Sequence, residues 1–440
     1  MKKELKKIGG ALKDPAQTAK GMRDLIGEEL FGFQGFFEKA AEVALYYGFK
    51  PIETPIMEDI RIYLSGLGEG TDVIDKQLYS LKTKGGDLLA LRPEFTAGVM
   101  RSYIEQGMQS WPQPVQLYSY GACFRHDKPQ KGRYRQFYQF NMEILGTDKS
   151  IADATIIRLT TLILQEAGLE NLTLEINSIG DKECRPAYRK ELVNYYKKHV
   201  GEICADCKER LKTNPLRLLD CKEEKCQPIK AGAPTSVSFL CANCKHQFKE
   251  VLEYLETLGV EYTINNHLVR GLDYYTKTVF EIKLPDATNE DGSKTEGLSV
   301  ASGGRYDYLA KALGSKKDVP GVGVGIGTDR VLMDKHADLA PRIVKKPKMY
   351  FIQLGFDAKL KSLLVTEILR KCRIPVSHSL SKDSLGVQLG MAEKLGVPYA
   401  LILGQREVFD NTIIVRNMTN RSQEIVKIDK LAEYLKKIKF

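Results

Sequence analysis

The sequence predicts an α+β protein with three parts: a large domain on an antiparallel sheet, a cysteine-rich insertion, and a small α/β domain at the C-terminus. Two aromatic-rich strands flank a basic loop between Leu117 and Gly146, and strands joined in this way usually pair antiparallel. The following segment is rich in Lys and Cys. Near the C-terminus, strands alternate with helices, which is typical of an α/β domain. We expect the large domain at 1–180 and 264–336, the insertion at 181–263, a linker at 337–348 and the last domain at 349–440.

Composition sets limits on the class of protein. A chain of 440 residues with 43% hydrophobic residues can form two or three domains with proper cores. The net charge of +10 favours polyanionic partners only weakly. The sequence contains no run of about eighteen apolar residues, so no membrane span is predicted. The Lys-rich start lacks the apolar core of a signal peptide. We therefore expect a cytosolic protein whose nine cysteines are reduced, so CxxC spacing indicates metal before disulfide.

The first elements are a helix and a strand. Apolar residues recur at helical spacing over 28–47, and Gly48 ends the pattern. The residues 50–56, which include Pro55, follow as a strand. Packing of a helix on a core explains this periodicity without any function.

Next, an apolar strand ends in the polar cluster Arg92-Pro93-Glu94-Phe95-Thr96, and a helix follows. A carboxylate beside a hydroxyl can bind an ammonium group through charge-assisted hydrogen bonds. The same residues can instead form a capping box, in which Thr96 starts the helix and Glu94 supports the turn. Both interpretations remain open from these residues alone.

The hairpin at 117–146 brings three polar side chains together. Arg125 ends the first strand, and Gln139 and Glu143 lie on the second. Every second residue of a strand points the same way, so the three can share one face. They would line a pocket beneath a basic loop. The alternative is an ordinary hairpin with a solvated tip.

A helix at 152–167 and a strand at 172–179 lead into the insertion, which carries two CxxC pairs. Cys204, Cys207, Cys241 and Cys244 supply four thiolates that can enclose a structural zinc ion. Cys221 and Cys226 form a reserve pair, and a site made of one CxxC pair plus these two is possible. Incidental buried cysteines are the alternative.

Three further segments follow the insertion. Arg270-Gly-Leu-Asp-Tyr274-Tyr275 precedes a strand at 278–282, and simple packing with a surface ion pair would explain it. The segment 303–307, Gly-Gly-Arg-Tyr-Asp, has glycines that permit close backbone approach. Glycine alternates with β-branched residues over 321–327 and Arg330 follows, but the Gly-Lys-Ser/Thr ending of a P-loop is absent.

The C-terminal domain is expected to contain alternating strands and helices. The strands are expected at 349–354, 374–376, 399–402 and 412–415, and the helices at 358–371 and 384–395.

Several of these segments together resemble one known family. The stretch FRHDKPQKGRYRQFYQ resembles motif 2 of the class II aminoacyl-tRNA synthetases in its histidyl-tRNA synthetase form. RPEFTAG and RGLDYY resemble further histidyl signatures, and the glycine-rich segment with Arg330 resembles motif 3. Phe95 stands where that family commonly has a small residue. The resemblance implies a class II synthetase-like catalytic domain and a C-terminal anticodon-binding domain.

The resemblance implies an ATP site formed by three arginines. Arg125 and Arg270 would contact the α-phosphate or the substrate carboxylate, and Arg330 would contact the γ-phosphate. Gly325 and Gly327 would let adenine pack against bare backbone, and Mg²⁺ would bridge the phosphates. Three arginines from separate segments meet the electrostatic requirement of chemistry at a triphosphate.

The resemblance also implies a histidine pocket and a tRNA surface. The family places the substrate amino group at Glu94 and Thr96 and the imidazole between the two tyrosines. The full set expected in the pocket is Glu94, Thr96, Gln139, Glu143, Tyr274 and Tyr275. The basic loop would contact the tRNA acceptor end through Lys128, Gln130 and Arg133.

The expected protein is a homodimeric histidyl-tRNA synthetase that uses ATP and Mg²⁺, with zinc as a possible structural ion. The helix at 28–47 and the strand after it resemble motif 1, which forms the dimer interface in the family. The alternatives are non-catalytic paralogues: a regulatory subunit of ATP phosphoribosyltransferase or a tRNA-sensing module. The presence of Arg125, Arg270 and Arg330 argues against both.

Overall fold

The computed structural model describes residues 15–68, 71, 73–130, 132–288, 294–295, 297–333, 339–342 and 344–438. The chain divides between Pro341 and Arg342 into two compact units, and each is described by itself. The division falls within the predicted linker 337–348, of which 337, 338 and 343 lie outside the described residues.

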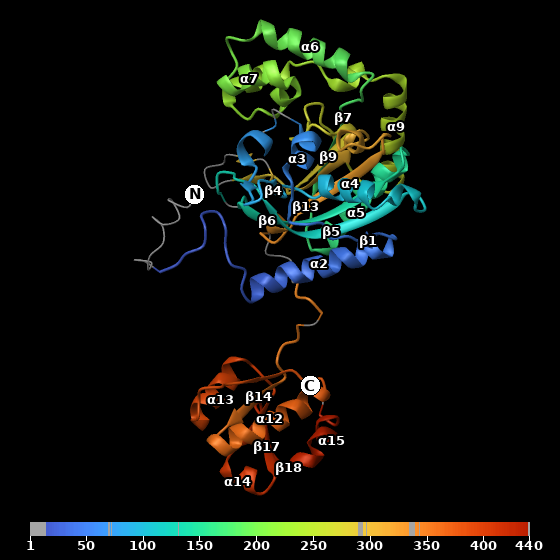
Figure 1. The fold of residues 1–440 in the computed structure, drawn as a ribbon. Helices are drawn as coiled ribbons and strands as arrows, with labels where there is room; N and C mark the ends of the chain where they lie inside the picture. The colour runs from blue at the N-terminus through green and yellow to red at the C-terminus, as the bar shows by residue number, and fades with distance from the viewer. Residues whose placement is uncertain are drawn as a thin grey trace. The chain divides into compact units, whose positions relative to one another are not determined.

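An eight-stranded sheet forms the centre of the first unit (Figure 1), in the order β1-β5-β6-β13-β12-β9-β7-β8. All neighbours from β5 to β7 in that order pair antiparallel, and only the edge strands β1 and β8 pair parallel. The predicted antiparallel sheet is therefore confirmed. The strands are β1 Lys50–Pro51, β5 Val115–Phe124, β6 Gln136–Leu145, β7 Thr173–Ser178, β8 Thr263–Ile264, β9 Thr276–Lys283, β12 Ser299–Arg305 and β13 Gly321–Gly327.

Side-chain alternation gives the sheet two different faces. On β6, Phe140, Met142 and Ile144 join a core that includes side chains of helices α2, α5 and α9. Gln139 and Glu143 point to the other face, where helices α3 and α4 and a small sheet of β2, β4 and β3 lie. The bounds are α2 Glu28–Tyr46, α3 Ile60–Leu67, α4 Thr96–Glu105, α5 Ser150–Glu166, α9 Ala242–Thr257, β2 Met57–Asp59, β3 Ser80–Lys82 and β4 Leu88–Leu91.

The strand predicted at 50–56 is shorter than expected. It ends as β1 at Pro51, and the next strand, β2, begins only at Met57. Pro51 and Pro55 have no N–H to donate, which limits ladder pairing here. One further bond, from the Ile52 nitrogen to the Tyr118 oxygen at 2.9 Å, continues the pairing with β5.

The insertion is mainly helical. Its first helices are α6 Arg185–Lys198, α7 Ala205–Thr213 and the short α8 Gln227–Ala231. Figure 1 shows α6 and α7 at the end of this unit opposite α2. The last helix of the predicted insertion, α9, packs on α5 and contacts β9. Helix α9 therefore packs with the domain that contains the large sheet, and not with helices α6 and α7 of the insertion.

The second unit has a five-stranded sheet in the order β15-β14-β16-β17-β18. The predicted alternation of strands and helices is confirmed, while strand β18 and helices α14 and α15 had not been predicted. The elements are β14 Met349–Gln353, α12 Phe356–Lys371, β15 Val376–His378, α13 Leu385–Lys394, β16 Tyr399–Leu403, α14 Gln405–Phe409, β17 Thr412–Asn417, β18 Gln423–Lys427 and α15 Leu431–Leu435.

Among the described residues of both units, no helix combines the length and the apolarity that crossing a membrane would require.

Candidate active site

The β5–β6 hairpin forms the floor of the site. Residue pairs in its register include Leu117 with Glu143 and Gly121 with Gln139. Arg125 follows β5 directly, and its Nε donates to the Pro93 oxygen at 2.9 Å. Its guanidinium carbon lies 5.3 Å from the ring centre of Phe137. Phe137, Gln139 and Glu143 are separated by even numbers of residues on β6, so their side chains point to the same face of the sheet. The hairpin therefore presents the three predicted side chains on one side of the sheet.

Glu94 is buried and caps helix α4. It accepts hydrogen bonds from the backbone nitrogens of Thr96 at 2.6 Å and Ala97 at 2.9 Å. Burial raises the pKa of Glu94, although these bonds oppose the shift. The Tyr274 hydroxyl donates to its Oε2 at 3.4 Å. The helix-capping alternative is thus correct in part, and the same carboxyl group also contacts the predicted pocket.

Glu143 is buried in the pocket and accepts hydrogen bonds from two hydroxyl groups. The Thr96 hydroxyl donates to its Oε1 at 2.6 Å, and the Tyr306 hydroxyl donates to its Oε2. Burial raises the pKa of Glu143 to about 8. At neutral pH this carboxyl group therefore carries a proton for much of the time in the free site.

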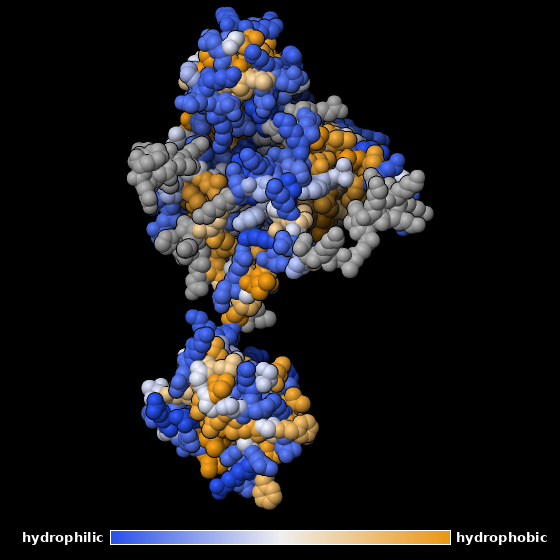
Figure 2. All heavy atoms as spheres, turned by 90° about the vertical axis from the view of Figure 1, so that its left-hand side faces the viewer, coloured by the Kyte–Doolittle hydropathy of each residue, from blue (hydrophilic) through white to orange (hydrophobic). Residues whose placement is uncertain are grey.

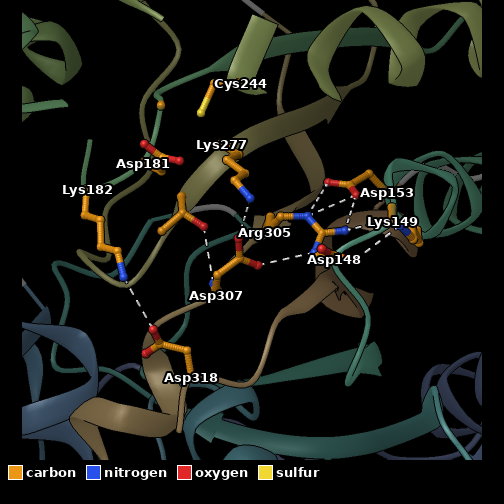
Figure 3. Close-up of polar contacts among 12 residues, drawn as sticks. Asp148, Lys149, Asp153, Asp181, Lys182, Cys244, Lys277, Arg305, Asp307 and Asp318 are labelled. Atoms are coloured by element: carbon orange, nitrogen blue, oxygen red, sulfur yellow. Dashed lines mark hydrogen bonds and ion pairs between the residues drawn. The ribbon is translucent and has the colours of Figure 1, made fainter. Parts of the chain in front are cut away.

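The sequence did not predict Tyr306 as a site residue, although its segment 303–307 has the glycines of a close backbone approach. The signal in the sequence that could have identified Tyr306 is a tyrosine that follows a pair of glycines at the end of a strand. Arg305 beside it is completely buried and pairs with Asp153, while its Nη1 donates to Asp307 at 3.2 Å (Figure 3). This ion-pair network fixes the backbone from which Tyr306 reaches Glu143.

The two predicted tyrosines lie together in the pocket. The ring centres of Tyr274 and Tyr275 are 4.5 Å apart, and the ring centre of Tyr306 is 5.7 Å from that of Tyr274. Burial raises the pKa of Tyr274 and Tyr275, so their hydroxyls stay protonated and can donate. Arg185 fixes the backbone here, because its Nη2 donates to the Tyr275 oxygen at 2.6 Å.

The predicted arginines lie near one another. Arg270 Nη1 is 3.6 Å from Glu281 Oε1, and Arg330 Nη1 donates to the Ser299 oxygen at 2.7 Å. Burial lowers the pKa of Arg330, and the positive charges of Arg133, Arg125 and Arg270 lower it further. Because these guanidinium groups act on one another, they form a positive region suited to a polyanion.

Glycine alternates on β13 because one face of this strand lies against the pocket. A Cβ atom on Gly323 would lie 1.6 Å from Glu143 Oε2. A Cβ atom on Gly325 would lie 3.3 Å from Asn141 Nδ2 and 3.4 Å from Gln139 Nε2, whereas Gly327 has more room. Val322, Val324 and Ile326 point to the opposite core. Gly325 and Gly327 thus lie on the same strand face as the pocket.

The loop after Arg125 exposes the three residues predicted to contact tRNA: Lys128, Gln130 and Arg133. A turn joins two of them, since the Arg133 nitrogen donates to the Gln130 oxygen at 2.8 Å. Arg330 Nε donates to the Gly132 oxygen at 3.2 Å. The loop is therefore attached to the arginine region, and Arg133 Nη1 also lies 3.6 Å from Asp127 Oδ2.

Phe95 is part of the core on the pocket side of the sheet, which also contains Tyr274 and Tyr275. It is completely buried in the core that contains Val99 and Met100. The Arg92 guanidinium carbon lies 4.1 Å from its ring centre, and Arg92 Nη1 donates to the Thr54 oxygen at 2.8 Å. The larger side chain is a packing feature.

The cysteines predicted to share one metal ion lie in two separate groups. The first group contains Cys204 and Cys207 together with the reserve pair, Cys221 and Cys226. Its four sulfur atoms lie within 4.8 Å of one another. The second group contains Asp181, Cys184, Cys241 and Cys244. The structure does not bring the first predicted set of four together, because α7 packs within the helical part of the insertion while α9 packs against the sheet. Spacing along the chain could not reveal this. The alternative set, one CxxC pair with Cys221 and Cys226, matches the first group.

Comparisons with known proteins agree with this geometry. Residues 21–331 match the family model described as histidyl-tRNA synthetase. The chain is 37% identical to the histidine–tRNA ligase of Dehalococcoides mccartyi strain 195 over 422 residues, which is 96% of this chain and 99% of that protein. The chain belongs to the histidyl-tRNA synthetase family. The family that the motifs predicted is thereby confirmed, together with its class, the aminoacyl-tRNA ligases.

Two more comparisons cover nearly the whole chain, and a third covers its C-terminal part. The histidine–tRNA ligase of Desulforamulus reducens is 37% identical over 418 residues, 95% of this chain and 98% of that protein. The crystal structure of apo S. aureus histidyl-tRNA synthetase has a TM-score of 0.77 and 30% identity, covering 96% of this chain and 100% of that one. Residues 350–438 match a model described as an anticodon binding domain. The predicted class II fold with its C-terminal domain is confirmed.

Proposed function

We propose that this chain activates L-histidine with ATP and transfers it to the 3′ end of tRNA(His). The observation that carries the proposal is a buried, hydrogen-bonded cluster of carboxyl and hydroxyl groups next to a cluster of arginines. The pocket is suited to an amino acid with a polar ring, and the arginines are suited to a triphosphate. Family membership supports the same pair of substrates.

In the first step, an oxygen of the histidine carboxylate attacks the α-phosphorus of ATP. A bond forms between that oxygen and phosphorus, the bond from phosphorus to the bridging oxygen breaks, and pyrophosphate leaves. The carboxylate is already ionised at neutral pH, so no protein base is required. Arg125 and Arg270 stabilise charge at the α-phosphate, and Arg330 holds the γ-phosphate. Positioning and charge neutralisation lower the barrier.

The pocket recognises histidine from both ends. Glu94 and Thr96 receive the ammonium group, and the Tyr274 hydroxyl near Glu94 supports that end. Glu143 and Tyr275 contact the imidazole, because a ring with one donor and one acceptor nitrogen requires both kinds of partner. Gln139 completes the floor.

Magnesium belongs with the bound triphosphate, which would supply most of its ligands together with water. Glu281 is a carboxylate that fits beside it. Burial opposes ionisation of Glu281, but the charge of Arg270 and a hydrogen bond from Ser299 outweigh burial and lower its pKa. Adenine would pack on the β13 face of Gly325 and Gly327, where the strand itself carries no side chain, beside Asn141, Gln139 and Arg330.

The second step moves the histidyl group to tRNA. A hydroxyl of the terminal ribose attacks the acyl carbon and gives up its proton to the departing phosphate. The bond from the acyl carbon to the phosphate oxygen breaks, so that the ester forms and AMP leaves. Lys128, Gln130 and Arg133 would guide the acceptor end through phosphate and polar contacts. The C-terminal unit would bind the anticodon.

A homodimer is part of the proposal. The unit with the large sheet exposes apolar side chains at the end of α2 and in the segment after it, and the C-terminal unit exposes one apolar face of α12. Figure 2 shows such apolar surface in orange on both units. Exposed apolar patches of this kind mark protein interfaces. The residues are Leu45, Tyr46, Tyr47, Ile56, Met57, Phe356, Leu360, Leu363 and Leu364. We place this dimer in the cytosol, where its cysteines stay reduced.

Zinc is proposed at the first cysteine group. The Sγ atoms of Cys204 and Cys221 are 3.8 Å apart. The Cys207 backbone nitrogen donates to Cys204 Sγ at 3.3 Å, and the Cys204 backbone nitrogen donates to Cys226 Sγ at 3.2 Å. Four thiolates leave no open position, so the ion would be structural.

Charging of tRNA(His) with labelled histidine tests the function. The proposal predicts ATP-dependent formation of histidyl-tRNA. Binding of tRNA without charging would point instead to a sensing module. Stimulation of ATP phosphoribosyltransferase without charging would indicate a regulatory subunit.

A further inference from the structure

A second group of metal-binding side chains lies where the insertion joins the sheet. Asp181 and Cys184 follow β7, where the chain enters the insertion. Cys241 and Cys244 begin helix α9, by which the chain returns. Asp181, Cys184 and Cys244 are buried, and Cys241 is partly exposed. Two segments about sixty residues apart thus supply two ligands each.

The distances agree with a tetrahedral zinc site. Zinc bonds of about 2.3 Å to sulfur and about 2.0 Å to oxygen imply edges of about 3.8 Å between two sulfurs and about 3.5 Å between sulfur and oxygen. The Sγ atoms of Cys184 and Cys244 are 3.8 Å apart, and Cys184 Sγ is 3.5 Å from Asp181 Oδ1. All four ligand atoms lie within 4.8 Å of one another.

The surrounding backbone is shaped to hold a sulfur atom. Gly180 has a φ of 66°, and a Cβ atom there would lie 2.5 Å from Cys184 Sγ. The Asp181 nitrogen donates to the same sulfur at 3.4 Å. The separation of Cys184 Sγ from Cys244 Sγ, 3.8 Å, is far longer than a disulfide bond of about 2.05 Å. The sulfurs are therefore adjacent but unbonded.

We propose that Asp181, Cys184, Cys241 and Cys244 bind a structural Zn²⁺ ion that joins the two ends of the insertion. Three thiolates and a carboxylate form a closed tetrahedral set. The ion would also fix the turn at Gly180, which pairs with the catalytic sheet. Lys277 donates its backbone N–H to the Gly180 oxygen at 2.7 Å. Figure 3 shows Asp181 and Cys244 near Lys277, whose ammonium group pairs with Asp307 at 3.0 Å.

Elemental analysis of the full-length protein, purified without chelator and dialysed to remove loose metal, tests the site. With both cysteine groups occupied, the protein should hold two zinc ions per chain. Cys184→Ser should halve this number, and Cys221→Ser in the other group should halve it independently. Cys372→Ser is the matched control, because Cys372 lies outside both groups. A wild-type protein without zinc, or no loss of zinc in Cys184→Ser, would overturn the proposal.

Cobalt substitution gives a second test that needs no variant. The zinc-free wild-type protein is titrated with Co²⁺ alone, and thiolate-to-cobalt absorption is followed. Two equivalents should bind tetrahedrally, with a weaker thiolate band per ion at the site that has three sulfurs. Saturation at one equivalent with the absorption of four thiolates, or no tetrahedral cobalt at all, would contradict the second site. Neither measurement depends on histidine activation.

Discussion

Glu143 is the residue at which most constraints of the site meet. Two hydroxyl groups donate to its carboxyl group, and Gly323 of the neighbouring strand leaves just enough room for it. Burial without a neighbouring cation keeps the proton on this group until about pH 8. A carboxyl group held in this state can take or release a proton when a ligand arrives.

The raised pKa of Glu143 predicts a pH dependence of stability. The folded protein keeps a proton that the unfolded chain releases above about pH 4.5, so stability should fall as pH rises toward about 8. Glu143→Gln removes this titration. The wild type should therefore lose about 1.4 kcal/mol per pH unit more than the variant between pH 5.5 and 7.5. Urea unfolding followed by fluorescence of Trp111, the single tryptophan, measures the difference. Parallel pH profiles would contradict it.

Gly323→Ala should damage the histidine pocket. Its new methyl group would overlap the Glu143 carboxyl group, and overpacking of this kind costs roughly 1–3 kcal/mol. We expect weaker histidine binding by calorimetry and a lower free energy of unfolding. Gly390→Ala on α13 is the control, because a Cβ atom there meets nothing within 4 Å. Equal histidine affinity in wild type and Gly323→Ala would show that the methyl group is accommodated.

At the scale of elements, the loop between β5 and β6 links the two proposed steps. Its exposed Lys128 is proposed to serve tRNA alone, whereas the charge of Arg133 also lowers the pKa of Arg330.

Lys128→Ala should therefore raise the KM for tRNA severalfold while pyrophosphate exchange stays within about twofold, since one lost phosphate contact weakens binding without changing the adenylate site. Lowering the salt concentration should partly restore charging. A matching loss in exchange would place Lys128 in the first step instead.

The elements also show what the sequence could predict. The long strands β5, β6 and β13 and the helix α2 were predictable because their alternation or periodicity is strong. The short β1 was not, because two prolines interrupt its pairing. The residues proposed for the histidine pocket came from local motifs and the family resemblance. The pairing of cysteines did not, because it depends on how α7 and α9 pack, which is a long-range property. Tyr306 was missed for the same reason, since its partner Glu143 is distant in sequence.

At the scale of the whole molecule, the proposed dimer predicts a measurable association. Tyr46 at the end of α2 is 86% exposed in the single chain of 49.5 kDa. Tyr46→Glu should lower the dimer fraction at micromolar concentration, because a charge would be buried without a partner. Sedimentation velocity measures it, with Leu258→Glu on the exposed end of α9 as the control. A monomeric wild type would remove the basis of this proposal.

The central claim is that the arginine cluster activates histidine on ATP. Histidine-dependent exchange of pyrophosphate into ATP tests it most directly. The wild type should exchange with histidine and not with other amino acids. Arg270→Ala should lower exchange about 100- to 1000-fold, because it removes a charge aimed at the reacting phosphate. Arg406→Ala, at a side chain that is 89% exposed, should leave it unchanged. Exchange that does not require histidine, or that survives in Arg270→Ala, would contradict the account.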